Sequence, residues 1–305
     1  LLCAQHDVER QPDACPSSST RRGVDVPHAL DDAVRWTLPA PGLVSMASQA
    51  PSSLPPAPGV ALVTGAARRI GRAIALKLAA QGFDIGVHYG ASADEAHDLV
   101  AVLRGLGVRA AAISADLAQP EQVPTLLRRA REALGPIAVL VNNAATFADD
   151  RLPSLSLHGL RSHLDTNLLS PILLSQAFAA QPDLPPGAAI VNLIDQRVLK
   201  PSPPFFSYGV SKAALWYATR TLAQELAPRI RVNAVGPGPV LPSIHQQPAD
   251  FEHEAQSTLL AHPVAPDEVA TAVAYLLSAS SVTGQMICVD AGQHLLWRTP
   301  DMAGL

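Results

Sequence analysis

The fold of this 305-residue chain is decided by Val60-Ala61-Leu62-Val63-Thr64-Gly65-Ala66-Ala67-Arg68-Arg69-Ile70-Gly71. A short apolar run, which is typical of a strand buried on both faces, leads through a tight turn into a segment with helical periodicity. Such a turn offers backbone N–H groups and a helix N-terminus to a pyrophosphate. With only two glycines the turn by itself also fits a tight connection without a ligand. In its strand-to-helix context it predicts nucleotide binding by Gly65, Arg68, Arg69, Ile70 and Gly71.

From Gly59 onward, short β-rich runs alternate with longer amphipathic runs, which is typical of βαβ units and a parallel sheet. The expected strands are residues 60–64, 83–89, 108–114, 137–142, 188–194, 230–235 and 285–289. The expected helices are residues 69–81, 93–106, 121–134, 157–180, 207–227 and 267–278. The sequence therefore predicts an α/β doubly wound, Rossmann-type fold with about seven parallel strands flanked by helices. It forms one domain, residues 58–297, followed by a tail, residues 298–305.

Residues 1–57 differ from the rest of the chain in being rich in proline and serine and in showing little regular periodicity. Ordering such residues costs about 1–2 kcal/mol each, with little apolar burial to offset the cost. We expect a disordered tail here. Met46 stands directly ahead of the proline-rich segment and is a candidate for the natural start of the protein, which would leave residues 1–45 outside it.

Composition excludes several classes of partner. The chain is 48% hydrophobic and 16% charged with a net charge of -4, and it has no run of basic residues, so neither nucleic acid nor an anionic membrane surface is expected. No run of eighteen apolar residues is available to span a bilayer. Of the three cysteines only Cys288 lies in the probable core, so no disulfide framework or metal site is expected. These features fit a cytoplasmic protein that binds small molecules.

The end of the second expected strand, His88-Tyr89-Gly90-Ala91-Ser92, is where nucleotide-binding proteins of this fold distinguish their dinucleotides. An acid there would bind a ribose 2′-hydroxyl, but none occurs before Asp94. With two arginines in the nearby turn, this stretch favours NADPH over NADH. The alternatives are an ordinary strand-end role for His88 and a solvated helix-start charge for Arg68.

Asp116 and Leu117 follow the third expected strand. Asp116 is placed to accept from an adenine amine, although it also fits a cap of the next helix.

A second constellation consists of Asp195, Tyr208 and Lys212. Tyr208 and Lys212 are four residues apart in an expected helix, so they lie on the same face. A nearby ammonium favours the ionised form of a phenol, which predicts a lowered pKa for Tyr208 and a role in proton transfer. Taken alone, the pair also fits two surface residues of a helix.

These motifs together resemble the short-chain dehydrogenase/reductase family, from Val60 to about Trp297. The matching features are the 64–71 turn, Asn142-Asn143-Ala144, Asn167, the Tyr208 and Lys212 pair, and Pro237-Gly238. The resemblance implies that Tyr208 donates a proton, that Lys212 lowers its pKa and binds the nicotinamide ribose, and that Asn167 holds a water of the proton relay. It also implies cofactor contacts for Tyr89, Ser92, Asn143, Ala144, Pro237, Gly238 and Val240.

Two departures from the common pattern refine this reading. Most members have a serine thirteen positions before the tyrosine, where this chain has Asp195, and a glycine where it has Arg69. An ionised carboxylate only accepts hydrogen bonds, which suits a substrate with N–H donors or a ring nitrogen to be protonated better than a simple ketone. Both departures resemble the pteridine reductase branch. That branch also has a phenylalanine at the place of Phe147, which sandwiches the pterin against the nicotinamide.

The branch commonly has an arginine for the 2′-phosphate where this chain has Gly90-Ala91. Asp195 also fits a strand-end acid that caps a loop, and Phe147 also fits packing under a loop.

The favoured expectation is an NADPH-dependent reductase of a pterin C=N bond, such as that of a dihydropterin or dihydromonapterin. Tyr208 and Asp195 would deliver the proton, and Phe147, Asp195 and Tyr208 would contact the substrate. An alternative is an NAD(P)-dependent reductase or dehydrogenase of a ketone, alcohol or 3-oxoacyl thioester. A third, of another class, is a catalytically silent NADP-binding sensor or assembly protein.

Residues 240–262 lie where this fold has a substrate lid, and we expect a mobile solvated loop there. Its His245, His253 and His262 do not have metal-ligand spacing. The family commonly forms tetramers through the helices expected at residues 157–180 and 207–227. We therefore expect a homotetramer or homodimer.

Overall fold

The computed structural model describes residues 59–243 and 246–297. The expected N-terminal and C-terminal tails, Met46 and His245 lie outside the described residues. Within them, the seven expected strands form one parallel sheet in the order β3-β2-β1-β4-β5-β6-β7, so the doubly wound fold is confirmed. The strands are β1 Val60–Val63, β2 Asp84–Tyr89, β3 Ala110–Ser114, β4 Ile137–Asn142, β5 Ala189–Leu193, β6 Arg231–Pro237 and β7 Met286–Val289.

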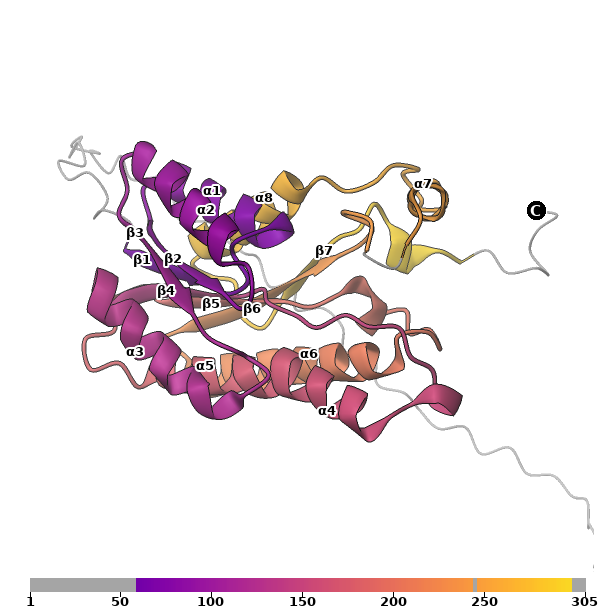
Figure 1. Ribbon diagram of the computed structural model, residues 1–305, viewed down its shortest axis with the longest axis horizontal. Coiled ribbons are helices and arrows are strands. Elements are labelled where there is room, and N and C mark those ends of the chain that lie inside the picture. The colour runs from indigo at the N-terminus through magenta and orange to yellow at the C-terminus, as the bar shows by residue number, and fades with distance from the viewer. Residues whose placement is uncertain (1–58, 244–245, 298–305) are drawn as a thin grey trace, which may run out of the picture. The chain divides into compact units, whose positions relative to one another are not determined.

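Helices cover both faces of the sheet (Figure 1). On one face lie α1 Arg69–Ala80, α2 Ala93–Gly105 and α8 Pro266–Ser278, and on the other lie α3 Val123–Leu134, α4 Leu157–Leu164, α5 Ser170–Ala179 and α6 Phe206–Leu226. Each face has its own apolar cluster. Ile74, Leu99 and Val269 belong to the first, and Leu126, Leu174 and Ile190 belong to the second. The near-continuous burial of β1, β4 and β5 follows from this double coverage.

The single helix expected at residues 157–180 is wrong in its middle. Between α4 and α5 the chain forms a π-helical turn, Asp165–Leu169. Pro171 has no N–H group to donate to the carbonyl of Asn167, four residues earlier, so the regular α-helical hydrogen bonding is interrupted there. Such single π turns in helices often occur at functional sites, and this one carries Asn167.

The loop expected at residues 240–262 is wrong in part, because it contains the helix α7 Pro248–Gln256. Proline at the first position of a helix loses no hydrogen bond, and Ala255 is completely buried. This nine-residue helix is too short to give a clear periodicity in the sequence.

The connections from β1 and β4, which are neighbours in the sheet, lead in opposite directions along it. This arrangement opens a crevice at the carboxyl ends of the strands, the usual ligand position in open α/β sheets. The turn after β1, the loop after β4 and Asp195 after β5 all lie at that end.

Candidate active site

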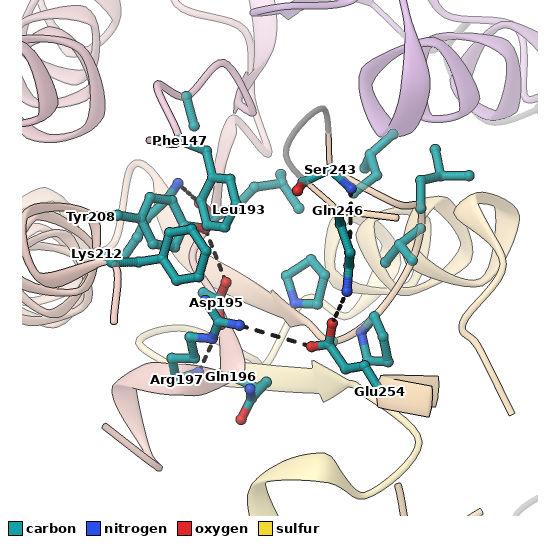
Figure 2. Close-up of a pocket in the computed structure, with 18 of the residues that line it drawn as sticks. Phe147, Leu193, Asp195, Gln196, Arg197, Tyr208, Lys212, Ser243, Gln246 and Glu254 are labelled. Atoms are coloured by element: carbon teal, nitrogen blue, oxygen red, sulfur yellow. Dashed lines mark hydrogen bonds and ion pairs between the residues drawn. The ribbon is translucent and has the colours of Figure 1, made fainter. Parts of the chain in front are cut away.

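A cavity of about 590 Å³ lies at the carboxyl ends of the strands. It runs from Arg69 and Ile70 at the first turn, past Asp195, Tyr208 and Lys212, to helix α7. Figure 2 shows Tyr208 and Lys212 on one side of this cavity and Glu254 of α7 on the other. Some of the residues expected to hold a cofactor line the same cavity as Phe147, Asp195, Tyr208 and Lys212; they are Arg69, Ile70, Asn143, Pro237, Gly238 and Val240. The other expected residues are not among its lining residues: Gly65, Arg68, Gly71, His88, Tyr89, Ser92, Asp116, Leu117, Ala144 and Asn167.

The turn after β1 is built from close backbone approaches. Gly65 has a φ of +61°, and a Cβ on Gly71 would lie 2.2 Å from the carbonyl oxygen of Gly65. Only glycine fits at position 71, so the helix begins directly against the turn. The N-cap residue of α1, Arg68, makes no side-chain cap bond, which leaves the first N–H groups of the helix without a capping side chain. This geometry suits an anion.

His88 lies beneath this turn. Its Nδ1 accepts from the backbone N–H of Gly65 at 3.0 Å, and its Nε2 is 3.2 Å from the carbonyl oxygen of Ala115. Burial lowers the pKa of His88 to about 4, so the ring is neutral near pH 7 with its proton on Nε2. The ring thus links the backbone of the turn at Gly65 to the backbone after β3 at Ala115.

The two arginines of the turn point in different directions. Arg69 has a φ of +55°, in the left-handed region that favours glycine. Its guanidinium donates to the carbonyl oxygens of Leu241 and Pro242, each at 3.1 Å, and so ties the turn to the loop before α7. Arg68 instead makes an exposed ion pair with Glu95 of α2 at 3.4 Å.

The other residues expected around the adenosine half of a cofactor have local partners. Tyr89 lies near His97, with ring centroids 6.2 Å apart, and Ser92 precedes α2 without capping it. Asp116 accepts from the backbone N–H of Ala118 at 2.9 Å and from the amide of Gln119 at 3.0 Å, while Leu117 is buried. Asp116 therefore already has two hydrogen bonds within its own loop.

The loop after β4 is fastened to the first turn. Thr64 Oγ1 accepts from the backbone N–H groups of Asn143 and Ala144 at 2.9 and 3.0 Å. The Asn143 amide donates to the carbonyl oxygens of Thr64 and Gly65.

On the opposite side of the crevice, after β6, a Cβ on Gly238 would lie 2.6 Å from the Cα of Asp290. Pro237, Gly238 and the buried Val240 line the cavity.

The acid, the phenol and the ammonium meet at the centre of the cavity. The Tyr208 hydroxyl donates to Asp195 Oδ2 at 3.0 Å, and the backbone N–H of Arg197 donates to Asp195 Oδ1 at 2.8 Å. Lys212 Nζ donates to the carbonyl oxygen of Leu193 at 2.6 Å and lies 5.7 Å from the centroid of the Tyr208 ring. The carboxylate is thus the hydrogen-bond partner of the phenol, whereas the ammonium lies near the phenol ring and is bonded to the backbone.

Burial governs the ionisation of these three groups. It raises the pKa of the Asp195 carboxyl, although Arg197 opposes the rise. It also raises the pKa of Tyr208 well above its ordinary value, helped by the negative charge of Asp195, and it lowers the pKa of Lys212 to about 8. The pKa of Tyr208 is therefore raised in this structure, whereas the sequence predicted a lowered value; the effect of Lys212 on it stays a prediction. Desolvation and the nearby carboxylate both favour the neutral phenol.

Asn167 and Phe147 fix the loop after β4. The Asn167 amide exchanges two hydrogen bonds with the backbone of Thr146, at 2.8 and 2.9 Å, and donates to Ser211 Oγ at 3.0 Å. The Phe147 ring stacks on Phe205 with centroids 4.4 Å apart and meets Tyr208 edge to face at 4.8 Å. These contacts place Phe147 directly beside the phenol.

The family model described as "Enoyl-(Acyl carrier protein) reductase" matches residues 65–294. A short-chain type dehydrogenase/reductase from Picea abies is 34% identical over 249 residues, which cover 77% of this chain and 92% of that protein. The 3-oxoacyl-[acyl-carrier-protein] reductase FabG of Staphylococcus epidermidis is 33% identical over 240 residues, covering 77% and 98% respectively.

The chain belongs to the short-chain dehydrogenase/reductase family.

Among solved structures, this oxidoreductase is similar to FolM Alternative dihydrofolate reductase 1 from Brucella canis, which was crystallised with NADP. The two are 44% identical with a TM-score of 0.77, and the match covers 81% of this chain and 98% of that chain.

The residues of this reductase's site that the sequence did not predict include three with contacts to the central groups or to α7. They are Arg197, Phe205 and Glu254, all of which line the cavity. Position offered a signal for two of them, since Arg197 lies two residues after Asp195 and Phe205 three before Tyr208. Glu254 offered none, because its place depends on α7. In the part of the chain that the structure describes, no group of three or more His, Cys, Asp or Glu could hold a metal ion, and no helix could cross a membrane.

Proposed function

We propose that this protein is an NADPH-dependent reductase that transfers a hydride to a C=N bond of a pterin, such as a dihydropterin or dihydromonapterin. The observation that carries the proposal is the contact between the Tyr208 hydroxyl and Asp195 at 3.0 Å, beside the ring of Phe147. An acid replaces the serine common in this family, and it lies next to an aromatic side chain that a flat heterocycle could stack on.

The first turn fits the pyrophosphate of a dinucleotide. The close approach of Gly71 to Gly65 and the uncapped start of α1 leave space and N–H groups for phosphate oxygens. Gly65, Ile70 and Gly71 would hold the phosphates, and Lys212 would hold the nicotinamide ribose. NADPH, when bound, supplies the hydride. The NADP in the Brucella canis structure supports this choice of cofactor, and the absence of an acid at residues 89–92 agrees with it.

The substrate end of the cavity suits a flat, nitrogen-containing ring. Stacking on Phe147 is worth on the order of 1 kcal/mol beyond area burial. An ionised Asp195 would accept from ring N–H or amino groups, which a simple ketone lacks. One face of the Phe147 ring is stacked on Phe205, so a pterin stacked on Phe147 would take the other face or displace Phe205, and in either place it would lie close to the phenol of Tyr208.

Proton delivery would involve the Tyr208–Asp195 pair as a unit. The phenol carries the proton at neutral pH because burial and the adjacent carboxylate hold its pKa high. Burial also raises the pKa of Asp195, which brings a carboxyl group closer to the pH range in which it can donate a proton. Asn167 is buried and its amide is bonded to Thr146 and Ser211, so the role that the resemblance implies for it, holding a water of the proton relay, stays a prediction.

A second candidate is the reduction of a 3-oxoacyl thioester. The similarity to FabG, at 33% identity over 98% of that protein, favours it. Asp195 weighs against it, because an ionised carboxylate repels the partial negative charge of a carbonyl oxygen.

A panel of substrates with purified protein and NADPH separates the two. We expect oxidation of NADPH with 7,8-dihydropterin and 7,8-dihydromonapterin, and little with acetoacetyl thioesters or simple ketones. Strong turnover of the thioester and none of the pterins would replace the first proposal by the second. No oxidation with any compound of the panel, despite tight NADPH binding, would favour a silent cofactor-binding protein.

A further inference from the structure

Arg197 makes contacts that connect the acid of the site to the lid. It lies in the short helical turn Gln196–Val198, which Asp195 caps by accepting from the Arg197 backbone N–H at 2.8 Å. Its guanidinium carbon lies 5.0 Å from the centroid of the Phe205 ring, and its Nη2 lies 3.8 Å from Glu254 Oε1. Its side chain is only 24% exposed. Arg197 thus touches the acid, the aromatic stack and the lid helix α7 at once.

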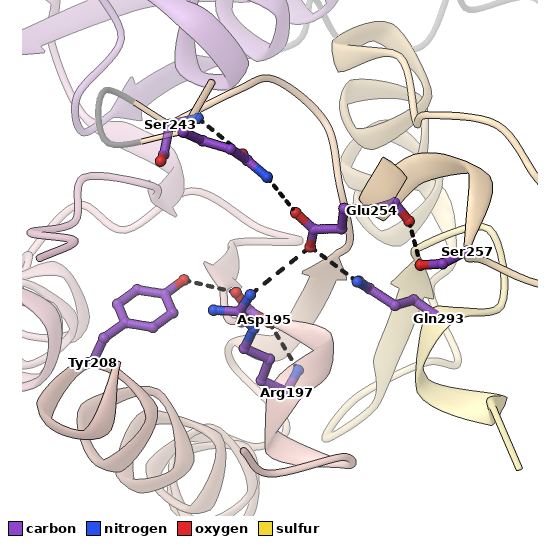
Figure 3. A network of polar contacts seen from close by, with 8 residues as sticks. Asp195, Arg197, Tyr208, Ser243, Glu254, Ser257 and Gln293 are labelled. Carbon is purple, nitrogen blue, oxygen red and sulfur yellow. Dashed lines mark hydrogen bonds and ion pairs between the residues drawn. The ribbon is translucent and has the colours of Figure 1, made fainter. Parts of the chain in front are cut away.

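Glu254 is the point at which the lid is fastened. Besides Arg197, it accepts from the amide of Gln246, in the loop before α7, at 2.9 Å. It also accepts from the amide of Gln293, after β7, at 3.0 Å. Figure 3 shows the contacts of Arg197 and Gln293 meeting at the Glu254 carboxylate, and Figure 2 shows the contact of Gln246 with it. Because Glu254 belongs to α7, the position of the Arg197 guanidinium depends on where that helix lies.

Titratable groups surround Asp195 from several elements. Tyr208 and Lys212 face it from α6, Arg197 from its own turn, and the thiol of Cys288 from β7. Further charged groups that line the cavity are Arg69, Asp149, Asp250 and Glu254. Of the influences that lower the pKa of the Asp195 carboxyl, the charge of Arg197 is the largest, and the same charge lowers the pKa of Tyr208. Arg197 therefore acts on both members of the pair.

We propose that Arg197 is a positioning residue for the Tyr208–Asp195 pair and that Glu254 of α7 holds it in place, so that proton delivery depends on the lid. This inference rests on the proposed function. Arg197 supplies the backbone N–H that orients one carboxylate oxygen, and its guanidinium is the positive charge of that turn. A displaced α7 withdraws the Glu254 carboxylate and frees the guanidinium to move away.

The sign of the effect follows from the electrostatics. Reduction requires a protonated donor, so the rate falls as pH rises through the pKa of the pair. Removing the positive charge of Arg197 favours the protonated carboxyl, which moves this fall to higher pH. A purely structural role would lower the rate at all pH values without moving the profile.

The test compares pH profiles of kcat/KM for 7,8-dihydromonapterin with saturating NADPH. We expect the alkaline fall to move to higher pH in Arg197→Gln and to stay in place in Arg197→Lys. Arg220→Gln is the matched control, because Arg220 is an exposed cation stacked on Trp216, with its guanidinium carbon 6.0 Å from the ring centroid. An unmoved profile in Arg197→Gln overturns the proposal.

The link between Arg197 and α7 is tested by measuring the same pH profile for Glu254→Gln and for the double variant Arg197→Gln/Glu254→Gln. If Glu254 acts through Arg197, the double variant has the same profile as Arg197→Gln alone. Additive changes would show that Glu254 acts on its own and would overturn that part of the inference.

An infrared titration keeps this test separate from the proposed function. The carbonyl band of a protonated carboxyl group, assigned by its loss in Asp195→Asn, reports Asp195 directly. We expect the band to persist to higher pH in Arg197→Gln, even if the wild-type protein reduces no pterin. If no pterin is reduced but the band shifts in Arg197→Gln, the pterin proposal is rejected and the positioning role of Arg197 is supported. If the band does not shift, the positioning role of Arg197 is rejected.

Discussion

The Tyr208 hydroxyl donates to Asp195 at 3.0 Å, while Lys212, four residues further along α6, donates to the backbone of Leu193 instead. The phenol is therefore hydrogen-bonded to an acceptor and not to the ammonium. Its pKa is held high, and the proton stays on the oxygen. This arrangement suits a reductase, which must deliver a proton to its substrate.

Replacement of Gly71 by alanine should abolish the geometry of the first turn. The new Cβ would lie 2.2 Å from the carbonyl oxygen of Gly65, which is too close without movement of the backbone. We expect NADPH affinity to fall tenfold or more, about 1.4 kcal/mol, in fluorescence titrations. Gly105→Ala is the control, because nothing lies within 4 Å of its Cβ position, and it should leave affinity unchanged. Equal affinities in both variants would contradict this account of the turn.

Replacement of Phe147 by alanine or leucine should weaken pterin binding. Stacking on the aromatic face contributes about 1 kcal/mol, so KM for a dihydropterin should rise about fivefold, and leucine should not restore it. The dissociation constant of NADPH, measured in parallel, should change little. Full rescue by leucine would show that Phe147 provides apolar volume and not a stacking face.

Acid should destabilise the protein through His88. Its pKa is about 4 when folded and about 6.5 when exposed, so the unfolded state binds more protons between these values. Stability is therefore lost as pH falls from 6.5 toward 4, by up to roughly 3 kcal/mol. Urea denaturation of wild type and His88→Asn at pH 7 and pH 5 measures the difference. If the difference in free energy of unfolding between wild type and His88→Asn is as large at pH 5 as at pH 7, protonation of His88 does not destabilise the fold.

Lys212 should reduce stability at neutral pH. Its pKa is lowered by burial to about 8 from an ordinary value of 10.5, so the unfolded state binds more protons between these values and stability rises with pH across that interval. Lys212→Met should lose reductase activity but unfold at higher urea concentration at pH 7. The excess in free energy of unfolding of Lys212→Met over wild type, at most roughly 3 kcal/mol at pH 7, should be smaller at pH 10. An excess that is independent of pH would show that the charge of Lys212 carries no penalty.

Much of the fold could be predicted from sequence because each buried strand and each long helix has its own pattern of apolar residues. The strands were placed within a few residues, and the sheet is doubly wound as expected. The π turn at Asn167 was missed because it arises from Pro171 and from side-chain bonds to distant residues. The helix α7 was missed because its burial depends on tertiary contacts and not on its own periodicity.

The site could be predicted where motif spacing brings residues together. Asp195 and Tyr208 were expected to act on the same substrate, and the structure brings them into hydrogen-bond contact. The sign of the pKa shift of Tyr208 could not be read from spacing, because it depends on how deeply the phenol is buried and on which neighbour its oxygen meets. Arg197 and Glu254 were missed for a similar reason, since their contact joins a turn to a helix that the sequence did not reveal.

The central claim is that Asp195 selects a pterin over a carbonyl substrate. The most direct test is the ratio of kcat/KM for 7,8-dihydromonapterin to that for an acetoacetyl thioester, measured in wild type and in Asp195→Ser. General acid–base catalysis is typically worth about 10²–10⁴-fold, so we expect the ratio to fall by a factor in that range while the NADPH dissociation constant stays the same. A ratio that is unchanged by Asp195→Ser would contradict the claim and leave Asp195 as a structural residue.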